Sequence, residues 1–327
     1  MYRHSRLVGI LGCAATLAIV GCSANGGMTP TSGSAATSFV QQVGGPTGAG
    51  WVHAGKLVYH VPHYFPTRSF AAAHRGSFNP NIVLTYGGGP VLTNPKTYLI
   101  LWGYQKYGDP DKVAKLLKEY FKVEGGSTHN NIYVQYYETV SGKNIYITNP
   151  KKQSAGVWDD EKDAVPQNPT DAQVAAEAQV GVTHFGYDPN GSYVVATPNG
   201  HNSTGFGTQW CAYHSASYIT GKLVSYTNLP YMPNAGGNCG ANYLNDPPKD
   251  ESGTDEGVTI VEGHEYGESV TDPSPPSGWY NSLYGEIGDI CAWTDIQNDP
   301  FRKKIYTMQP MFSNATQSCV QAYSSSE

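Results

Sequence analysis

The sequence is poor in charged residues, and basic residues are the scarcer kind. Only 14% of its 327 residues are charged, with 20 Lys and Arg against 26 Asp and Glu, and the formal net charge is -6. Proteins that bind nucleic acids neutralise phosphates with clustered Lys and Arg. The sequence contains no such cluster, so we expect no nucleic-acid partner.

Two common catalytic signatures are also missing. No GxSxG stretch marks the nucleophile of a serine hydrolase. The glycine run 87–89 is followed by proline and lacks the Lys-Ser/Thr pair of a phosphate-binding loop. These absences disfavour a serine hydrolase of that type and a P-loop nucleotide enzyme.

Long apolar runs are scarce, and the one at the N-terminus has the features of an export signal. Leu7–Val20 follows a short basic region and is too short for a comfortable bilayer span. Ile19-Val20-Gly21-Cys22 resembles a bacterial lipobox, so we predict that residues 1–21 form a lipoprotein signal peptide and that Cys22 is lipidated. The protein would then be exported and anchored to the membrane of the bacterial cell envelope. The alternative is an ordinary secretory peptide and a secreted protein.

The composition divides the rest of the chain into two parts. Residues 22–50 are rich in Gly, Ser, Thr, Ala and Pro, which predicts a flexible tether. Residues 51–327 are enough for a single globular domain. The chain has 38 Gly, 22 Pro and 24 Tyr, and this composition favours a loop-rich extracellular fold over a helical bundle.

Cysteines are few, and four of the six lie in the predicted domain: Cys211, Cys239, Cys291 and Cys319. An even number in an exported chain indicates disulfides. Three pairings are open on the sequence alone. We predict Cys211–Cys239 and Cys291–Cys319, because each of these pairs closes a local loop.

The apolar pattern predicts an α/β (α+β) domain with a mixed sheet. Thr170 begins a helix through a capping box with Gln173. We predict strands at 96–102, 193–197 and 224–231, helices at 109–122 and 170–182, and a closing pair of strands at 304–308 and 319–323. This order of elements is compatible with a single zincin-like domain stapled by disulfides.

The central motif of the chain is HEYGE, which runs from His264 to Glu268. On a helix, positions i and i+4 share a face, so His264 and Glu268 can bind one metal ion with Glu265 beside them. The HExxH signature of zincins uses this geometry, with two histidine ligands and a glutamate base. Here Glu268 stands in place of the second histidine. We predict an active-site helix over 254–272 that ends at Pro273.

The segment GEIGDIC, 285–291, supplies two further acids, Glu286 and Asp289. We predict that they complete the metal site begun by His264 and Glu268. Zinc is the favoured cation, and calcium is the alternative, because a carboxylate-rich site also suits cations that prefer oxygen ligands.

The other histidines have simpler interpretations. His214 is a candidate ligand or oxyanion stabiliser, but we interpret it as a core histidine beside a disulfide. Residues 51–80 carry a further group, which we interpret as surface histidines of a wrapping segment rather than as a metal cluster. They are His53, His60, His63 and His74.

Four segments between residues 80 and 295 form a set. They are GGPVLTNPKTYLILWG (88–103), WCAYHS (210–215), GGNCGANYL (236–244) and DEGVTIVEGHEYGESVTDP (255–273). Together they resemble the phosphate-induced protein, or EXORDIUM-like, family of plant extracellular growth-related proteins. The resemblance implies secretion and a shared fold but no activity. The HExxE, TDP, GW and EIGDxC elements also resemble exported bacterial proteins that carry the same pattern.

Two functions fit these features. The first is an exported metal-dependent hydrolase, a zincin-like peptidase that acts on a peptide or cell-envelope substrate with a metal-activated water and Glu265 as base. The alternative is an EXORDIUM-like extracellular binding or signalling protein in which any metal is structural. A carboxylate ligand in place of an imidazole adds negative charge at the metal, which predicts a weaker Lewis acid and slow or specialised hydrolysis.

Overall fold

The computed structural model describes residues 49–74 and 82–324. All of them belong to one compact unit, Val40–Glu327. The predicted signal peptide, Cys22 and nearly all of the predicted tether lie outside the described residues. Within the described ranges, no helix is both long enough and apolar enough to cross a membrane.

A mixed eight-stranded sheet runs through the unit, as the sequence predicts. Its strands lie in the spatial order β1 (Trp51–Ala54), β2 (Leu57–His60), β10 (Trp210–Ile219), β11 (Lys222–Leu229), β9 (Gly191–Ala196), β5 (Lys96–Trp102) and β8 (Ser154–Asp160), and β3 (His63–Pro66) also pairs with β10. Strands β11, β9, β5 and β8 are parallel. Strand β10 is antiparallel to β11, β2 and β3, so it turns the sheet from parallel to antiparallel.

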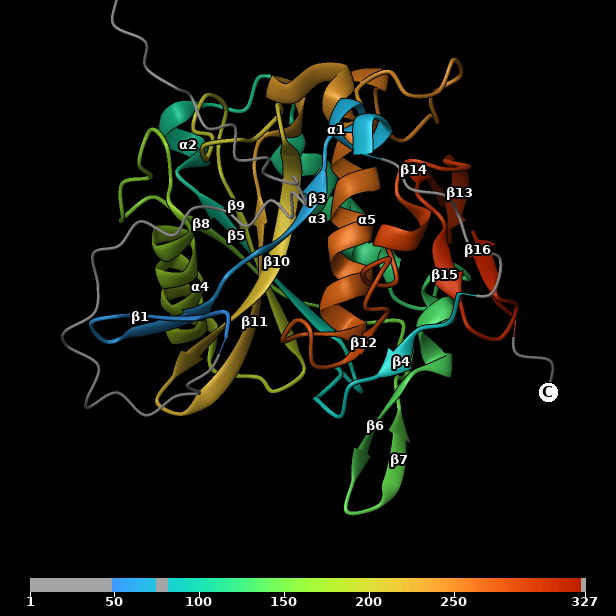
Figure 1. Cartoon of the computed structure of the whole chain (residues 1–327). Coiled ribbons are helices and arrows are strands. Elements are labelled where there is room, and N and C mark those ends of the chain that lie inside the picture. Colours follow the sequence, from blue (N-terminus) through green and yellow to red (C-terminus); the bar gives the residue numbers. More distant parts are fainter. Residues whose placement is uncertain (1–48, 75–81, 325–327) are drawn as a thin grey trace, which may run out of the picture. The chain divides into compact units, whose positions relative to one another are not determined.

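Helices cover both faces of this sheet. They are α1 (Arg68–His74), α2 (Tyr104–Tyr107), α3 (Val113–Glu124), α4 (Asp171–Phe185) and α5 (Glu256–Thr271), with 3₁₀ segments η1 (Asn130–Gln135), η2 (Met232–Cys239), η3 (Gly253–Asp255) and η4 (Asp289–Cys291). Figure 1 shows α4 on one face and α5 on the other. The side chains of strand β5 alternate between the two faces of the sheet. Leu99 and Leu101 pack with α3 and α5, while Ile100 and Trp102 pack with α4.

The smaller elements show where local patterns are sufficient and where they fail. The capping box of Thr170 and Gln173 begins α4 as predicted.

The predicted closing pair of strands is wrong. Strand β14 (Lys304–Met308) pairs with β13 (Gln297–Phe301), and β16 (Ser318–Val320) pairs with β15 (Met311–Ser313). Each forms a local hairpin instead, and Arg302 adopts a positive φ of 59° at the β13–β14 turn. The remaining two-stranded sheets are β4 (Thr85–Tyr86) with β12 (Trp279–Tyr280) and β6 (Tyr137–Val140) with β7 (Lys143–Tyr146).

Helix α5 is buried along its whole length, and all 16 of its residues are inaccessible or nearly so. It packs against β10, β11, α3, β14 and η2. The predicted disulfides are the ones formed: Cys211–Cys239 ties η2 to β10, and Cys291–Cys319 ties η4 to β16. Gly257 permits the close approach of η2, because a Cβ atom there would lie 1.9 Å from the carbonyl oxygen of Cys239.

We predict that Gly257→Ala lowers the free energy of unfolding by about 2 kcal/mol or more, because the new methyl group meets backbone that cannot swing away. Gly237→Ala is the matched control, since its Cβ would have no atom within 4 Å, and its effect should stay within about 0.5 kcal/mol. Urea unfolding of the two variants measures both values. Equal stability of the two variants would contradict the packing described for α5.

Candidate metal centre

Helix α5 turns His264 and Glu268 toward each other, as the i, i+4 spacing predicts. His264 Nε2 lies 3.1 Å from Glu268 Oε1, and the two side chains are 0% and 1% exposed. The imidazole is held on both sides, because Gln309 Nε2 lies 3.0 Å from its Nδ1 and the ring of Phe65 stacks on it at 3.8 Å. The ring therefore has one orientation, with Nε2 directed at the carboxylate.

The loop that ends in η4 brings Asp289 to the same place. Asp289 Oδ1 lies 3.9 Å from His264 Nε2, and the Asp289 backbone N–H donates to Glu268 Oε1 at 3.1 Å. Glycine is needed at position 288, because a Cβ atom there would lie 2.6 Å from His264 Nδ1 and 3.0 Å from Glu268 Oε1. The glycine of GEIGDIC thus lets the loop reach the helix.

His214, from β10, lies on the other side of Glu268. Its Nδ1 is 3.3 Å from Glu268 Oε2 and 3.4 Å from Glu265 Oε2, and its Nε2 is 3.5 Å from Glu286 Oε1. The two oxygens of Glu268 therefore face different imidazoles, Oε1 facing His264 and Oε2 facing His214. Glu268 is the central residue of the cluster.

His214 is a buried core histidine on the strand of Cys211, as interpreted from the sequence, but it is also part of the acidic cluster. The residue is fully buried and lies on the disulfide-bonded strand, but its ring faces the acidic cluster. Strand alternation is the signal that could have found it, because His214 lies two residues after Ala212, which packs in the layer of α5. The sequence offers no indication that β10 runs beside the HEYGE helix.

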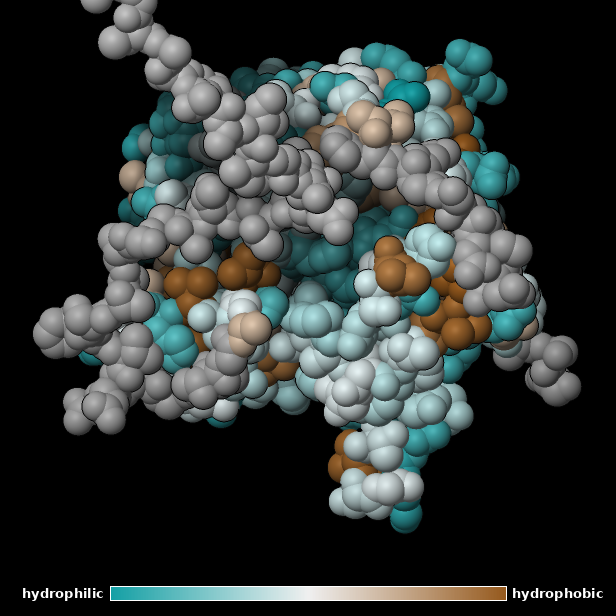
Figure 2. All heavy atoms as spheres, viewed as in Figure 1, coloured by the Kyte–Doolittle hydropathy of each residue, from teal (hydrophilic) through white to brown (hydrophobic). Residues whose placement is uncertain are grey.

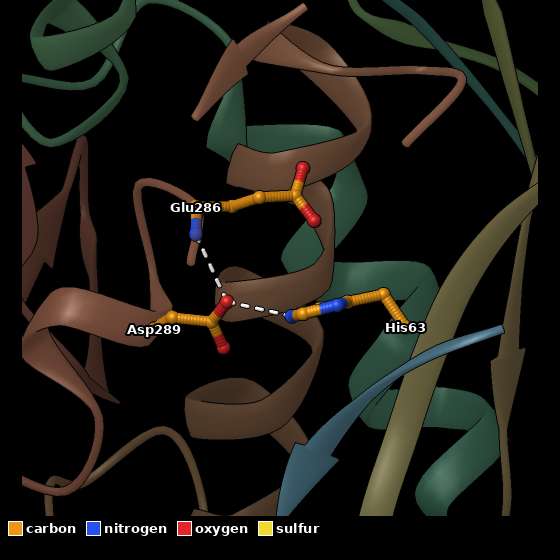
Figure 3. Close-up of side chains that lie close together, drawn as sticks. All are labelled: His63, Glu286 and Asp289. Carbon is orange, nitrogen blue, oxygen red and sulfur yellow. Dashed lines mark hydrogen bonds and ion pairs between the residues drawn. The ribbon is translucent and has the colours of Figure 1, made fainter. Parts of the chain in front are cut away.

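His63, from β3, lies at the surface as interpreted, but it also belongs to the cluster. Its Nε2 lies 2.7 Å from Asp289 Oδ2, and its side chain is 41% exposed. Figure 3 shows His63 and Asp289 pointing at each other, with the Glu286 backbone N–H donating to Asp289 Oδ2 and the Glu286 carboxylate nearby. The partners are 226 residues apart in the chain, so no local pattern connects them.

The charges of the cluster are strongly coupled. Burial alone would raise the pKa of Glu268, but His264 and His214 together lower it well below its ordinary value. Burial raises the pKa of Glu286 to about 8, with His214 opposing the shift. Burial also raises the pKa of Glu265. Glu268 is therefore the carboxylate that stays ionised between the two imidazoles.

The donor set fits a cation such as zinc. Within this cluster, three groups of potential ligands have their atoms within 4.8 Å of one another: His264–Glu268–Asp289, His214–Glu265–Glu268 and His63–Glu286–Asp289. Zinc binds imidazole nitrogen and carboxylate oxygen at about 2.0–2.2 Å, which places neighbouring ligand atoms about 3.4 Å apart in a tetrahedral site. Glu268 Oε1 lies 3.1 Å from His264 Nε2, and Glu268 Oε2 lies 3.3 Å from His214 Nδ1, which is close to this spacing, whereas Asp289 Oδ1 lies 3.9 Å from His264 Nε2.

Several buried atoms of the cluster lack hydrogen-bond partners among the described residues. They are His214 Nδ1, His264 Nε2, both carboxylate oxygens of Glu265 and both of Glu286. Buried polar atoms in native proteins are nearly always paired, and burying an unpaired polar group is unfavourable. A cation and its water would satisfy atoms that the protein leaves without partners.

Comparisons with known proteins return no relative. No protein-family model, no curated protein and no solved structure matches the chain. Its function therefore has to be inferred from its own side chains and their geometry.

Two other buried acids, Glu262 on α5 and Glu124 on α3, contrast with this centre. Burial raises the pKa of Glu262 well above its ordinary value, and the charge of Glu124 adds to the shift. Burial raises the pKa of Glu124 to about 8, although the Thr97 hydroxyl donates to it at 2.8 Å. No imidazole appears among the groups that shift either pKa. Near neutral pH these two acids are thus mainly protonated, whereas Glu268 is ionised.

We predict that Glu124→Gln removes part of the pH dependence of stability. From about pH 4.5 to pH 8 the folded protein keeps the Glu124 proton while the unfolded chain releases it. Stability therefore falls by about 1.4 kcal/mol per pH unit from this group. The free energy of unfolding of the variant should therefore rise relative to that of the wild type as the pH rises from 5 to 8. Denaturant melts at several pH values measure this, and parallel curves for the two proteins would contradict the assignment.

Proposed function

We propose that the protein is an exported metal-dependent hydrolase, a zincin-like peptidase. The observation that carries the proposal is the convergence of two buried imidazoles and several carboxylates around Glu268, with one nitrogen of each imidazole and the oxygens of Glu265 and Glu286 lacking a hydrogen-bond partner within the described residues. His264, Glu268 and Asp289 would hold the cation, zinc being favoured and calcium the alternative. Zinc bound there would supply a Lewis acid that makes water acidic and polarises a carbonyl group.

Glu265 is the residue suited to accept a proton. It follows His264 directly in the helix, and its carboxylate is 0% exposed. Neither of its oxygens has a hydrogen-bond partner within the described part of the chain, and Oε2 faces His214 Nδ1 at 3.4 Å. Burial raises its pKa, which makes it a stronger base than an exposed glutamate.

His214 compensates for the carboxylate that replaces a histidine in the motif. The added negative charge of Glu268 would weaken the cation as a Lewis acid, but the His214 ring lies 3.3 Å from that carboxylate. Burial alone would lower the pKa of His214, but Glu286, Glu265 and Glu268 together raise it well above its ordinary value. His214 therefore carries a proton that offsets part of the charge and can donate to a substrate oxygen.

The arrangement of the elements also supports a zincin-like domain. The HExxE helix α5 lies along a mixed sheet, and the antiparallel strand β10 is the strand it contacts most. Export and a lipid anchor at Cys22 fit the two disulfides, which form in oxidising compartments. The natural substrate would then be a peptide or a cell-envelope component.

A second candidate is an EXORDIUM-like binding protein with a structural ion. The observation that favours it is burial, because His264, Glu265 and Glu268 are at most 1% exposed. A cation would then hold β3, α5 and the 285–291 loop together without taking part in a reaction. The hydrolase needs both a cation and a catalytic base, whereas the binding protein needs no base and any cation in it is structural.

We predict that the purified protein contains about one equivalent of zinc or a similar cation and that His264→Ala loses it. The methyl group of alanine cannot bind a metal ion, and loss of one ligand typically weakens metal binding strongly. His184→Ala is the matched control, since His184 stacks on Trp158 away from the centre. Elemental analysis measures all three proteins. A wild type without metal after reconstitution would contradict the hydrolase.

We further predict that Glu265→Gln keeps the cation but lowers peptide hydrolysis by about 10²–10⁴-fold, the usual contribution of a general base. Glutamine has the same shape and cannot accept the proton. Hydrolysis of a mixed peptide library, followed by mass spectrometry, gives the rate, and elemental analysis gives the metal content. Full activity in this variant would show that another group is the base.

A further inference from the structure

Strand β3 occupies the edge of β10 at the point where β10 passes the centre. Four residues, His63–Pro66, form β3, and their partners on β10 include Tyr213 opposite Tyr64 and His214 opposite His63. Strand β2 pairs with β10 farther along, at Ser217 and Tyr218. The part of the β10 edge beside the centre is therefore taken by this one short strand.

The side chains of β3 alternate between the two faces of the sheet. Tyr64 points to the α4 face, where its hydroxyl donates to Asp171 at 3.1 Å. His63 and Phe65 point to the centre: His63 contacts Asp289 at 2.7 Å, and Phe65 stacks on His264 at 3.8 Å. The inward face of β3 thus presents one polar and one aromatic side chain to the candidate metal ligands.

Trp293 completes the aromatic contact. Its ring stacks on Phe65 at 4.8 Å, and its indole N–H donates to the Pro66 carbonyl at 2.8 Å. Phe65 is 1% exposed, and it lies between His264 and Trp293. The position behaves as a pocket for an aromatic side chain, with the indole N–H of Trp293 beside it as a donor to a backbone carbonyl.

This arrangement leaves the centre covered. Figure 2 shows hydrophilic residues lining a recess on this face, over β10 and α5 as seen in Figure 1. The side chains of His63 and Asp289 are 41% and 13% exposed, whereas those of His264 and Glu268 are at most 1% exposed. The ring of Phe65 lies directly on the His264 ring and covers that face of the imidazole.

We propose that the β10 edge at Trp210–His214 is a peptide-binding strand and that β3 is its internal occupant. The inference rests on the proposed hydrolase function. An extended peptide with an aromatic residue would replace β3, pair antiparallel with β10 and place its aromatic side chain between His264 and Trp293. Strand addition is a common mode of peptide recognition, in which the main chain supplies affinity and side-chain pockets supply specificity.

Strand β3 is suited to exchange with such a peptide. It is short, and Pro66 has no backbone N–H to donate to β10. A tethered segment competes at an effective concentration of about millimolar. Weakening β3 should therefore raise the affinity of a free peptide by the same factor by which it raises the open fraction.

The test uses the full chain and a fluorescein-labelled peptide, VPHYFPT, with the sequence of residues 61–67. Fluorescence polarisation measures its binding to the wild type and to His63→Ala/Phe65→Ala. We expect the double variant to bind the peptide at least tenfold more tightly, because it loses both inward contacts of β3. The matched control is His184→Ala/Phe185→Ala, an adjacent His-Phe pair on α4, and it should bind like the wild type.

The outcomes separate this inference from the proposed function. If the wild type and the folded double variant bind the peptide equally, or if neither binds it, the inference is overturned, whatever the metal content. Tight binding without cleavage would support the peptide-binding edge while overturning the hydrolase. If the double variant does not fold by circular dichroism, His63→Ala alone serves, with an expected gain of about threefold or more. No gain in that folded variant would also overturn the inference.

Discussion

The burial of ionisable groups on α5 is the constraint on which the rest of the structure depends. The helix is inaccessible along 16 residues, and it carries Glu256, Glu262, His264, Glu265 and Glu268. An unpaired buried charge is very unfavourable, so each group has to be neutralised or paired. Glu262 is neutralised by holding its proton, whereas Glu268 keeps its charge because two imidazoles bracket it. The second solution requires elements from distant parts of the chain.

Those elements reach α5 through close backbone contacts. Gly257 lets η2 pack on the helix, and Gly288 lets the loop of Asp289 approach His264 and Glu268. The Cys211–Cys239 and Cys291–Cys319 disulfides hold η2 and η4, the same two segments, to β10 and β16. Small residues and covalent links thus lie where the chain has to be brought against a buried polar helix. The precision of the centre follows from this packing.

Local physics explains what the sequence could predict. The i, i+4 relation of His264 and Glu268, the capping box at Thr170 and the buried strand Lys96–Trp102 all depend on neighbouring residues. The roles of His63 and His214 depend on strand order, because β3 and β10 meet α5 only in the folded chain. The predicted pairing of the last strands was wrong for a related reason. Each of these short strands pairs with its neighbour in the sequence, and two of those neighbours lack a clear apolar pattern.

The order of the strands also bears on how the centre would work. The HEYGE motif lacks the second histidine of HExxH, yet a second imidazole lies at the centre because β10 contributes His214. The position of His214 on a strand matters, because this strand is β10, and β3 covers the edge of β10. A peptide paired with that edge would bring its backbone beside His214 and Glu265 together. The same strand, β10, would then bind the substrate and carry His214. Strand β3, which covers the edge of β10, would control access to both.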